Sequence, residues 1–236
     1  MLGDHITIST DTTDTTMDLQ QARSNMIEQQ VRPWDVLDQR VLDVLAEVPR
    51  EAFVDPQYRG VAYSDYPLPI GHGQHMLKPT VEGRLLQALL LEITDTVLEI
   101  GTGSGFMTAC LARLCARVES IEIVPALVES AQVRIQERGI GNVSVMQQDA
   151  TLSWDAKDGY NAIAFTGATP SIPDYYKNKL KVGGRLFAFI GESTQPTMEA
   201  VLVTRVNDAE WIRESLFETS VDPLVNFDSK SSSFVF

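Results

Sequence analysis

A glycine-rich turn and two later carboxylates have the types and spacing needed to hold a nucleotide-like ligand. Residues 97–105 read VLEIGTGSG, an apolar run that passes directly into a turn with a glycine at every second position. Glycine lets the backbone approach a ligand closely because no Cβ stands in the way. Glu122 follows the turn by about 20 residues, where a doubly wound fold places the acid that binds ribose hydroxyls. Asp149 ends the next apolar run and would bring a second carboxylate to the same edge of the sheet.

The spacing of the glycines favours some cofactors over others. A dinucleotide site has glycines spaced G-x-G-x-x-G, and the third glycine packs a helix against a strand. Here the pattern is G-x-G-x-G, and Phe106 occupies the position of that third glycine. An acid, Glu99, stands just before the turn. A nicotinamide oxidoreductase is therefore disfavoured, and the spacing by itself indicates a cofactor pocket without identifying the cofactor.

Strand and helix patterns alternate on both sides of the turn and predict the elements that position these groups. Apolar runs predict buried strands, and two later runs of alternating apolar and polar residues predict an antiparallel hairpin. Strands alternating with helices are typical of an α/β sheet with helices on both faces. The expected strands cover residues 96–100, 117–123, 143–146, 160–166 and 185–190, with the hairpin at 198–206 and 211–220. The expected helices cover residues 17–31, a segment capped by Asp38 and ended by Pro49, residues 79–91, a segment from Phe106, a segment opened by Val124 and Pro125, and residues 172–181, stopped by Gly183 and Gly184. Residues 166–170 are expected to form a loop beside the glycine turn.

The chain divides into four predicted parts. Residues 1–16 are rich in Thr and Asp and predict a disordered tail, and residues 228–236 predict a flexible one. Residues 17–78 predict an N-terminal helical cap with an active-site loop, and residues 79–227 predict the cofactor-binding domain. The loop at residues 71–79 leads through Pro79 into a helix just before the first strand, so we expect it to lie over the cofactor.

The histidines and cysteines do not predict a metal site. His72 and His75 share one loop, but the chain has 3 His and 2 Cys in all, and none is placed to complete a tight site with them. Cys110 and Cys115 are five positions apart in one expected helix and would lie on different faces of it. Unpaired cysteines of this kind suggest a reducing cytoplasm.

Composition excludes several classes of function. The formal net charge is -13, which argues against a general nucleic-acid binder and against anionic membrane surfaces. No apolar run approaches the roughly 18 residues of a membrane span, and we expect no signal peptide because the start lacks a basic segment and an apolar core. A chain of 236 residues suffices for one domain with an added cap. Its oligomeric state stays open.

Several motifs resemble those of the protein-L-isoaspartate O-methyltransferases, a family of S-adenosylmethionine-dependent methyltransferases. The resemblance runs from about residue 20 to residue 227 and includes the N-terminal cap. It implies a doubly wound, Rossmann-like methyltransferase sheet that is mostly parallel, with a C-terminal antiparallel hairpin and an N-terminal helical cap. The matching segments are MIEQQVR at 26–32, VPREAFV at 48–54, AYSD at 62–65, LPIGHGQ at 68–74, VLEIGTGSG at 97–105, SIE at 120–122, LKVGGRL at 180–186 and PL at 223–224.

The resemblance also implies an activity and a set of site residues. The family transfers a methyl group from S-adenosylmethionine to the carboxylate of isoaspartyl residues in damaged proteins and leaves S-adenosylhomocysteine. The ester then closes to a succinimide, which partly reopens to normal aspartate. Glu99 would face the methionine end of the cofactor, Glu122 would hold the ribose, and Asp149 would read the adenine. The expected cofactor-binding residues are Gln74, His75, Met76, Glu99, Gly101, Thr102, Gly103, Ser104, Gly105, Glu122, Ile123, Asp149, Ala150 and Thr166, and the expected catalytic residues are His75, Leu77 and Lys78.

One position departs from the family pattern. After Gly-x-Gly-Gln the family usually has Thr-Ile-Ser, whereas this chain has His75, Met76 and Leu77. Leu77 stands at the family serine and neither donates nor accepts a hydrogen bond.

Three interpretations follow from that departure. The chain methylates isoaspartyl carboxylates, with Lys78 or His75 replacing the lost contact. Alternatively, it methylates another acceptor, such as a hydroxyl or a different carboxylate, and His75 serves as the base, because histidine ordinarily changes charge near neutral pH. In the third interpretation it binds S-adenosylmethionine without turnover, as a sensor or partner subunit. His75 is equally compatible with an ordinary packed or solvent-facing loop residue.

Overall fold

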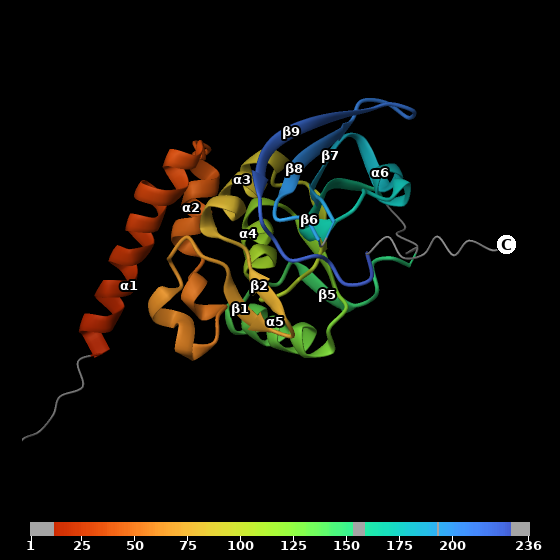
Figure 1. The fold of residues 1–236 in the computed structure, drawn as a ribbon. Helices are drawn as coiled ribbons and strands as arrows, with labels where there is room; N and C mark the ends of the chain where they lie inside the picture. The colour runs from red at the N-terminus through yellow and green to blue at the C-terminus, as the bar shows by residue number, and fades with distance from the viewer. Residues whose placement is uncertain (1–11, 153–158, 193, 228–236) are drawn as a thin grey trace, which may run out of the picture.

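A seven-stranded sheet with the order β5-β4-β3-β6-β7-β8-β9 forms the centre of the molecule (Figure 1). The computed structural model describes residues 12–152, 159–192 and 194–227, and for residues 12–17 the backbone alone. Neighbouring strands from β5 to β7 are parallel, and β8 is antiparallel to both β7 and β9. The strands are β3 (Thr96–Ile100), β4 (Arg117–Glu122), β5 (Val143–Gln147), β6 (Tyr160–Thr169), β7 (Leu180–Ile190), β8 (Met198–Arg205) and β9 (Trp211–Thr219). The predicted mostly parallel sheet with an antiparallel C-terminal hairpin is confirmed.

Helices cover both faces of the sheet. Alternate residues of a strand point to opposite faces, so Val97 of β3 packs in one core cluster with α3 and α4, whereas Leu98 and Ile100 pack in the other with Tyr176 of α6. The helices are α3 (Pro79–Leu89), α4 (Phe106–Leu114), α5 (Pro125–Glu137) and α6 (Asp174–Lys179). Strand order reverses between β3 and β6, and ligands of open α/β sheets bind beyond the carboxyl ends of the strands at such a point.

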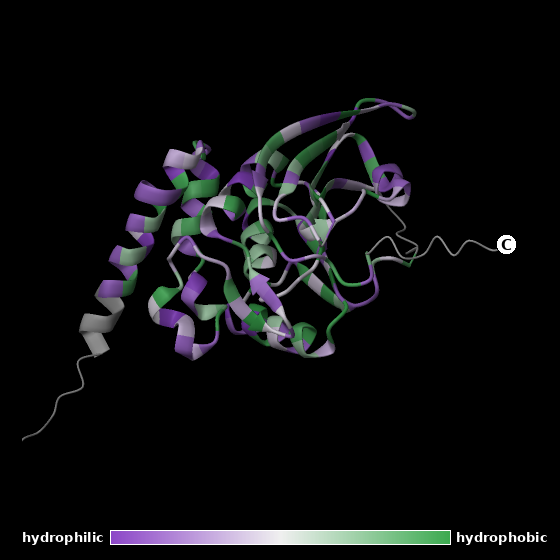
Figure 2. Cartoon of the chain, viewed as in Figure 1, coloured by the Kyte–Doolittle hydropathy of each residue, from purple (hydrophilic) through white to green (hydrophobic). Residues whose placement is uncertain are grey.

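The N-terminal segments form a cap beside α3 and α4 (Figure 1). The cap contains α1 (Thr12–Met26), a π-helical turn (Ile27–Val31), α2 (Gln39–Glu47), three 3-10 turns (Arg32–Trp34, Arg50–Ala52, Pro56–Val61) and a hairpin of β1 (Leu68–Gly71) and β2 (Gln74–Met76). Figure 2 shows mixed hydrophilic and hydrophobic residues along α1, while the central strands are mostly hydrophobic. Within the part of the chain that the structure describes, no helix combines the length and apolar character needed to cross a membrane.

Several predicted boundaries are wrong. Helix α1 begins at Thr12, inside the segment predicted to be disordered, and residues 1–11 lie outside the described residues, as do residues 228–236. The loop expected at residues 71–79 contains β2, which pairs with β1 across a turn at His72 and Gly73. The loop expected at residues 166–170 is instead the end of β6, whose register shifts between Ala164 and Ala168.

The double glycine after α6 also has a different role from the predicted one. Helix α6 ends at Lys179, and Gly183 and Gly184 lie inside β7, at an irregularity in its pairing with β6. Gly183 has a φ of 82°, and a Cβ on Gly184 would lie 2.8 Å from the carbonyl oxygen of Lys181. The irregularity in β7 therefore requires glycine at both positions. In the sequence, such a pair of glycines looks the same as the end of a helix.

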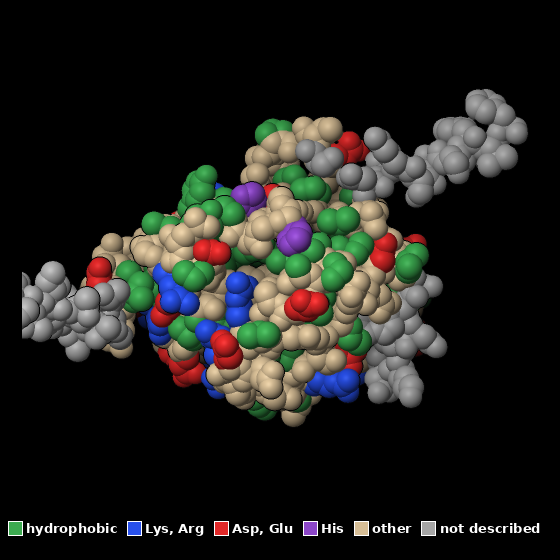
Figure 3. Space-filling view, turned by 90° about the horizontal axis from the view of Figure 1, so that it is seen from below, with side chains coloured by type: hydrophobic (Ala, Val, Ile, Leu, Met, Phe, Trp, Pro, Cys, Tyr) green, Lys and Arg blue, Asp and Glu red, His purple; other side chains and the backbone are tan. Residues whose placement is uncertain are grey.

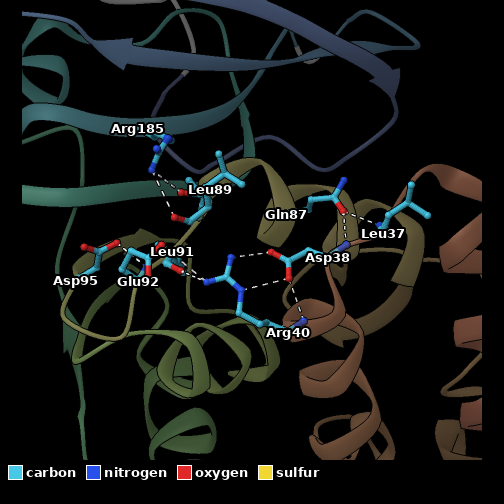
Figure 4. Close-up of polar contacts among 10 residues, drawn as sticks. Leu37, Asp38, Arg40, Gln87, Leu89, Leu91, Glu92, Asp95 and Arg185 are labelled. Atoms are coloured by element: carbon cyan, nitrogen blue, oxygen red, sulfur yellow. Dashed lines mark hydrogen bonds and ion pairs between the residues drawn. The ribbon is translucent and has the colours of Figure 1, made fainter.

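Polar contacts anchor the cap to α3 (Figure 4). Asp38 caps α2 by accepting a 2.9 Å hydrogen bond from the backbone N–H of Arg40, as predicted. The Arg40 side chain binds the Asp38 carboxylate and also the carbonyl oxygen of Leu91, just after α3. Gln87 of α3 accepts from the backbone N–H groups of Leu37 and Asp38. The start of α2 is thus fixed directly to the end of α3.

Asp38→Ala is expected to lower the free energy of unfolding by about 1 kcal/mol, because the first turn of α2 loses its cap. Asp43→Ala is the matched control, since Asp43 lies within the same helix and its carboxylate binds only the exposed Gln39 side chain among the hydrogen bonds of the described residues. That control should stay within about 0.5 kcal/mol of the parent. Urea unfolding of the three proteins measures both values, and equal losses in the two variants would contradict the capping role.

Candidate active site

The glycine turn after β3 is held by Glu122 at the end of β4. The backbone N–H of Gly103 donates to Glu122 Oε2 at 2.9 Å, and Glu122 Oε1 accepts from the backbone N–H groups of Ile123 and Val124. Gly103 has a φ of 52° and Gly101 a φ of 96°, which side chains rarely adopt. Glu122 is buried but lines the cavity beyond the strands. Each carboxylate oxygen has two lone-pair directions, so Glu122 can hold the turn and still accept one bond from a ligand at Oε2.

Thr166 of β6 closes the turn from the other side. Its hydroxyl donates to the carbonyl oxygens of Ile100 and Gly101. A Cβ on Gly101 would lie 2.5 Å from the Thr166 hydroxyl oxygen and 3.0 Å from Leu224. The ends of β3 and β6 therefore approach each other only because residue 101 lacks a side chain.

The main cavity lies at these strand ends and has an empty volume of about 670 Å³, counted out to the solvent. That volume is within the range of small-molecule sites, about 300–1,000 Å³. Apolar side chains form most of its wall, and its polar members are Gln74, His75, Glu122, Gln148, Thr166 and Asp222. Figure 3 shows histidine side chains with hydrophobic side chains around them on one face of the molecule. The apolar residues that line this cavity are Ile70, Leu77, Ile100, Ile121, Ile123, Val124, Leu127, Ala150, Leu224, Val225 and Phe227.

A second cavity of about 300 Å³ adjoins the main one. Both are lined by Gly101, Gly103 and Thr166, together with Ile70, His75 and Leu77. The second cavity is completed by Met76, Thr102, Ser104, Met107 and Glu82 of α3. The glycine turn therefore separates two chambers, and Leu77 lies at their junction.

Most of the predicted site residues meet at these cavities. Those lining the main cavity are Gln74, His75, Leu77, Gly101, Gly103, Glu122, Ile123, Ala150 and Thr166. Met76, Thr102 and Ser104 line the second cavity only. Lys78, Glu99, Gly105 and Asp149 line neither.

Glu99 is buried beneath the turn and lines neither cavity. It lies on the α4 side of β3, fully buried, and its Oε2 accepts from the hydroxyls of Thr108 at 2.5 Å and Ser120 at 2.6 Å. Ser120 in turn contacts the Thr102 hydroxyl. Burial raises the pKa of Glu99 to about 8, so the carboxyl is largely protonated at neutral pH. The residue braces β3, β4 and α4 from inside.

The other three residues outside the cavities have local structural roles. Asp149 accepts hydrogen bonds from Thr151 and from the side-chain amide of Asn226 at 2.7 Å, while its neighbours Gln148 and Ala150 line the cavity. Gly105 caps α4 with a φ of 87°, and a Cβ there would lie 3.2 Å from that of Ala131. Lys78 is the extended residue before Pro79 at the start of α3.

A segment that sequence reasoning did not assign to the site covers the main cavity. We call residues 221–227 the strap. Asp222 and Leu224 exchange backbone hydrogen bonds of 2.8 Å with Ala168 of β6, and the strap contributes Asp222, Leu224, Val225 and Phe227 to the cavity wall. The motif match at Pro223 and Leu224 was the available sequence signal, but nothing in its residue types pointed to a ligand.

The strap also contacts the hairpin above the site. Asp222 Oδ2 accepts from the backbone N–H of His75 at 2.6 Å and lies 2.9 Å from His75 Nδ1. His75 and Asp222 are both partly exposed. In the parts of the chain that the structure covers, no cluster of three or more His, Cys, Asp or Glu residues is arranged to hold a metal ion.

Comparison with known proteins identifies the family. The sequence model of protein-L-isoaspartate(D-aspartate) O-methyltransferase matches residues 21–228. The chain belongs to this family. A protein-L-isoaspartate O-methyltransferase from Rhodopseudomonas palustris (strain ATCC BAA-98 / CGA009) is 38% identical over 200 residues, covering 85% of this chain and 91% of the relative. Protein-L-isoaspartate O-methyltransferase 1 from Syntrophobacter fumaroxidans is 40% identical over 187 residues, covering 79% and 86%.

A solved structure shares the fold. A putative protein-L-isoaspartate O-methyltransferase from Plasmodium falciparum, in complex with S-adenosyl-L-homocysteine, superposes with a TM-score of 0.72 at 20% identity over 87% of this chain and 97% of that one. The predicted membership of the isoaspartyl methyltransferase family and the predicted methyltransferase fold are confirmed.

The brace under the turn of this methyltransferase predicts a pH-dependent stability. Glu99 has an ordinary pKa of 4.5, raised to about 8 in the folded protein. Between these values the folded state keeps a proton that the unfolded state loses, so this group makes stability fall as pH rises from 4.5 to about 8. Glu99→Gln retains a carbonyl oxygen for Thr108 and Ser120 but does not titrate. The free energy of unfolding of the variant, relative to that of the parent, should therefore rise by on the order of several kcal/mol between pH 4.5 and pH 8.

The measurement is urea unfolding of parent and variant at pH 5, 6, 7 and 8. Glu129→Gln, the same change at an exposed position of α5, should leave the pH dependence of the parent unaltered. Parallel curves for the parent and Glu99→Gln would show that Glu99 titrates normally in the folded protein.

Proposed function

We propose that this protein transfers a methyl group from S-adenosylmethionine to the carboxylate of isoaspartyl residues in proteins or peptides. The observation that carries the proposal is the pair of adjoining cavities at the reversal of strand order, in a chain whose relatives are named for this reaction. Cytoplasmic location belongs to the same proposal, supported by Cys110 and Cys115, which are buried and unpaired.

The residues present fit an adenosyl group. Glu122 offers carboxylate oxygens at the strand end where ribose hydroxyls bind in doubly wound folds, and Gly103 leaves the backbone bare beside it. The slot between Ile123, Leu127 and Phe227 is apolar, as a flat base requires. When bound, S-adenosylmethionine supplies a sulfonium methyl group that an anionic oxygen attacks directly.

The acceptor needs little chemical help from the protein. A carboxylate with a pKa near 4 is ionised at neutral pH, so no base has to remove a proton. Holding two reactants in line is worth roughly 7–11 kcal/mol of the barrier. The protein's task is therefore to orient the carboxylate and exclude water, and the apolar Leu77 at the junction of the cavities suits the second part of that task.

The backbone at Leu77 is fixed even though its side chain differs from the family serine. The carbonyl oxygen of Leu77 accepts a 2.5 Å hydrogen bond from the buried guanidinium of Arg50. A serine at this position would therefore present its hydroxyl from a defined place at the same junction. This makes position 77 suitable for a test of the substrate.

The decisive assay is transfer of labelled methyl groups to a peptide containing isoaspartate, with the same peptide containing aspartate as its control. The parent should label the isoaspartyl peptide alone. Leu77→Ser should increase kcat/KM by roughly tenfold, because a hydroxyl contact to a buried polar group is worth about 1–3 kcal/mol. Leu77→Ala removes the same bulk without adding a hydroxyl and should give no such gain.

Two outcomes would change the proposal. No labelled peptide from the parent, beside an active reference enzyme, would exclude isoaspartate as its acceptor. Activity that appears only in Leu77→Ser would place the change of acceptor at that position.

The contact between His75 and Asp222 favours a second candidate, methylation of a hydroxyl acceptor. A carboxylate 2.9 Å from Nδ1 orients an imidazole as a general base. The imidazole also lines both cavities. A hydroxyl, unlike a carboxylate, must lose its proton for methyl transfer, and general bases contribute about 10²–10⁴-fold to such steps.

The variant His75→Ala distinguishes the two candidates. A carboxylate acceptor is already ionised at neutral pH and needs no base, so the variant should keep most of its turnover with an isoaspartyl peptide. With a hydroxyl acceptor the variant should lose most of its turnover, because the base is removed. Measurement of kcat/KM for parent and variant with each acceptor decides between them, and retained turnover with the hydroxyl acceptor would exclude His75 as its base.

A further inference from the structure

One residue that lines the second cavity has a buried carboxylate oxygen without a partner. Glu82 of α3 lines this cavity and is fully buried. Its Oε2 accepts from Arg50 Nη1, whereas its Oε1 is buried and makes no hydrogen bond to any described residue. A buried acceptor of this kind is costly to leave unsatisfied, and a charged one more so.

The neighbours of Glu82 leave Oε1 for a ligand. The Arg50 guanidinium is shared between Glu82, the carbonyl oxygen of Ala62 at 2.7 Å and that of Leu77. It therefore neutralises one oxygen of Glu82 and is committed elsewhere with its other nitrogens. Among the described residues that line the second cavity, Glu82 carries the only carboxylate. A group that binds Oε1 has to be a hydrogen-bond donor, and a cation would bind most strongly.

The two cavities together suggest which cation this is. The main cavity has the features for an adenosyl group, and the second cavity continues from it past Gly101 and Gly103. A methyl donor with its adenosyl part in the main cavity has an amino-acid end of its own, which carries one ammonium and one carboxylate. The second cavity offers that end Glu82, and Thr102 and Ser104 line the same cavity.

We propose that Glu82 binds the α-ammonium group of the methyl donor through Oε1. This inference rests on the proposed use of S-adenosylmethionine and adds a specific recognition residue to it. It moves to Glu82 the contact with the methionine end that the sequence assigned to Glu99, whose carboxyl group lines neither cavity. It also explains how an acid can be fully buried, because the ligand completes the pairing that Arg50 begins.

Three product analogues test the assignment in the unaltered protein. Isothermal titration would compare S-adenosylhomocysteine with its deaminated analogue, which keeps the carboxylate, and with 5′-deoxy-5′-methylthioadenosine, which lacks the whole amino-acid end. The deaminated analogue should bind at least about tenfold more weakly than S-adenosylhomocysteine, because a charged hydrogen bond is lost. Equal affinities would overturn the assignment whatever any variant does.

Glu82→Gln then links the discrimination to this residue. Glutamine has nearly the same shape and can still accept from Arg50 with its carbonyl oxygen. Its affinity for S-adenosylhomocysteine should fall about tenfold or more, and its affinity for methylthioadenosine should equal that of the parent. The variant should bind S-adenosylhomocysteine and its deaminated analogue with equal affinity. Such non-additivity is expected when the two groups removed, the Glu82 carboxylate and the ligand ammonium, contact each other.

Other outcomes separate this inference from the proposed function. Equal loss of all three ligands would mean that Glu82 supports the fold, and circular dichroism and thermal unfolding of the variant would verify that. A raised KM for an isoaspartyl peptide with unchanged S-adenosylhomocysteine affinity would assign Glu82 to the acceptor instead. Absence of any S-adenosylhomocysteine binding by the parent would refute the cofactor itself.

Discussion

One buried guanidinium connects the cap, the active-site hairpin and the cofactor domain. Arg50 is 1% exposed, and its nitrogens donate to Ala62, Leu77 and Glu82, which come from three separate segments. Its guanidinium also stacks 5.0 Å from the ring centroid of Phe106, the first residue of α4. Breaking a buried ion pair by removal of one partner typically costs about 3–5 kcal/mol, because the other charge is left uncompensated. The position of the hairpin over the glycine turn therefore depends on a charge buried beneath both.

The burial of that pair has consequences for both of its members. Burial raises the pKa of the Glu82 carboxyl, while the Arg50 charge and hydrogen bond oppose the rise. A second cation near Oε1 would favour the ionised form further. Two carboxyl groups on the same face of the sheet thus have different environments. Glu99 is hydrogen-bonded by hydroxyls and keeps its proton near neutral pH. Glu82 is paired with the permanent positive charge of Arg50. This difference follows from the neighbours, since both carboxyl groups are fully buried.

The parts of the site that could be predicted from sequence are those formed locally. Gly101, Gly103 and Glu122 meet beside the cavity as expected, because the turn, the strand end and their spacing along the chain determine their positions. Their binding of a cofactor stays a prediction. Glu99 was misplaced because strand alternation directs it toward α4, and the face on which α4 packs follows from the fold. Asp149 was placed one residue away from the groups that line the cavity, since its carboxylate caps the following turn and binds Asn226.

The strap and Glu82 were not assigned to the site for a different reason. Asp222 meets His75 across 147 positions of sequence, and nothing in either segment predicts the other. Glu82 looks like an ordinary acid in the first turn of a helix and is fully buried only because Arg50 lies beneath it. The errors at residues 166–170 and at Gly183 and Gly184 share this origin, because strand irregularities use the same residue types as loops and helix stops.

Leucine at the family serine position is consistent with this arrangement of charges. The chemical step requires an anionic oxygen to lose water before it reaches the methyl group, and an apolar side chain at the junction of the cavities favours that loss. The hydroxyl of a serine would orient the acceptor by a hydrogen bond, and the leucine lacks that contact. Attraction between the acceptor and the sulfonium charge acts more strongly as the surroundings become less polar. Leu77 therefore lacks one orienting contact but makes the junction less accessible to water. The acceptor must then be oriented by the hairpin, which Arg50 fixes at the Leu77 carbonyl and Asp222 fixes at the His75 amide.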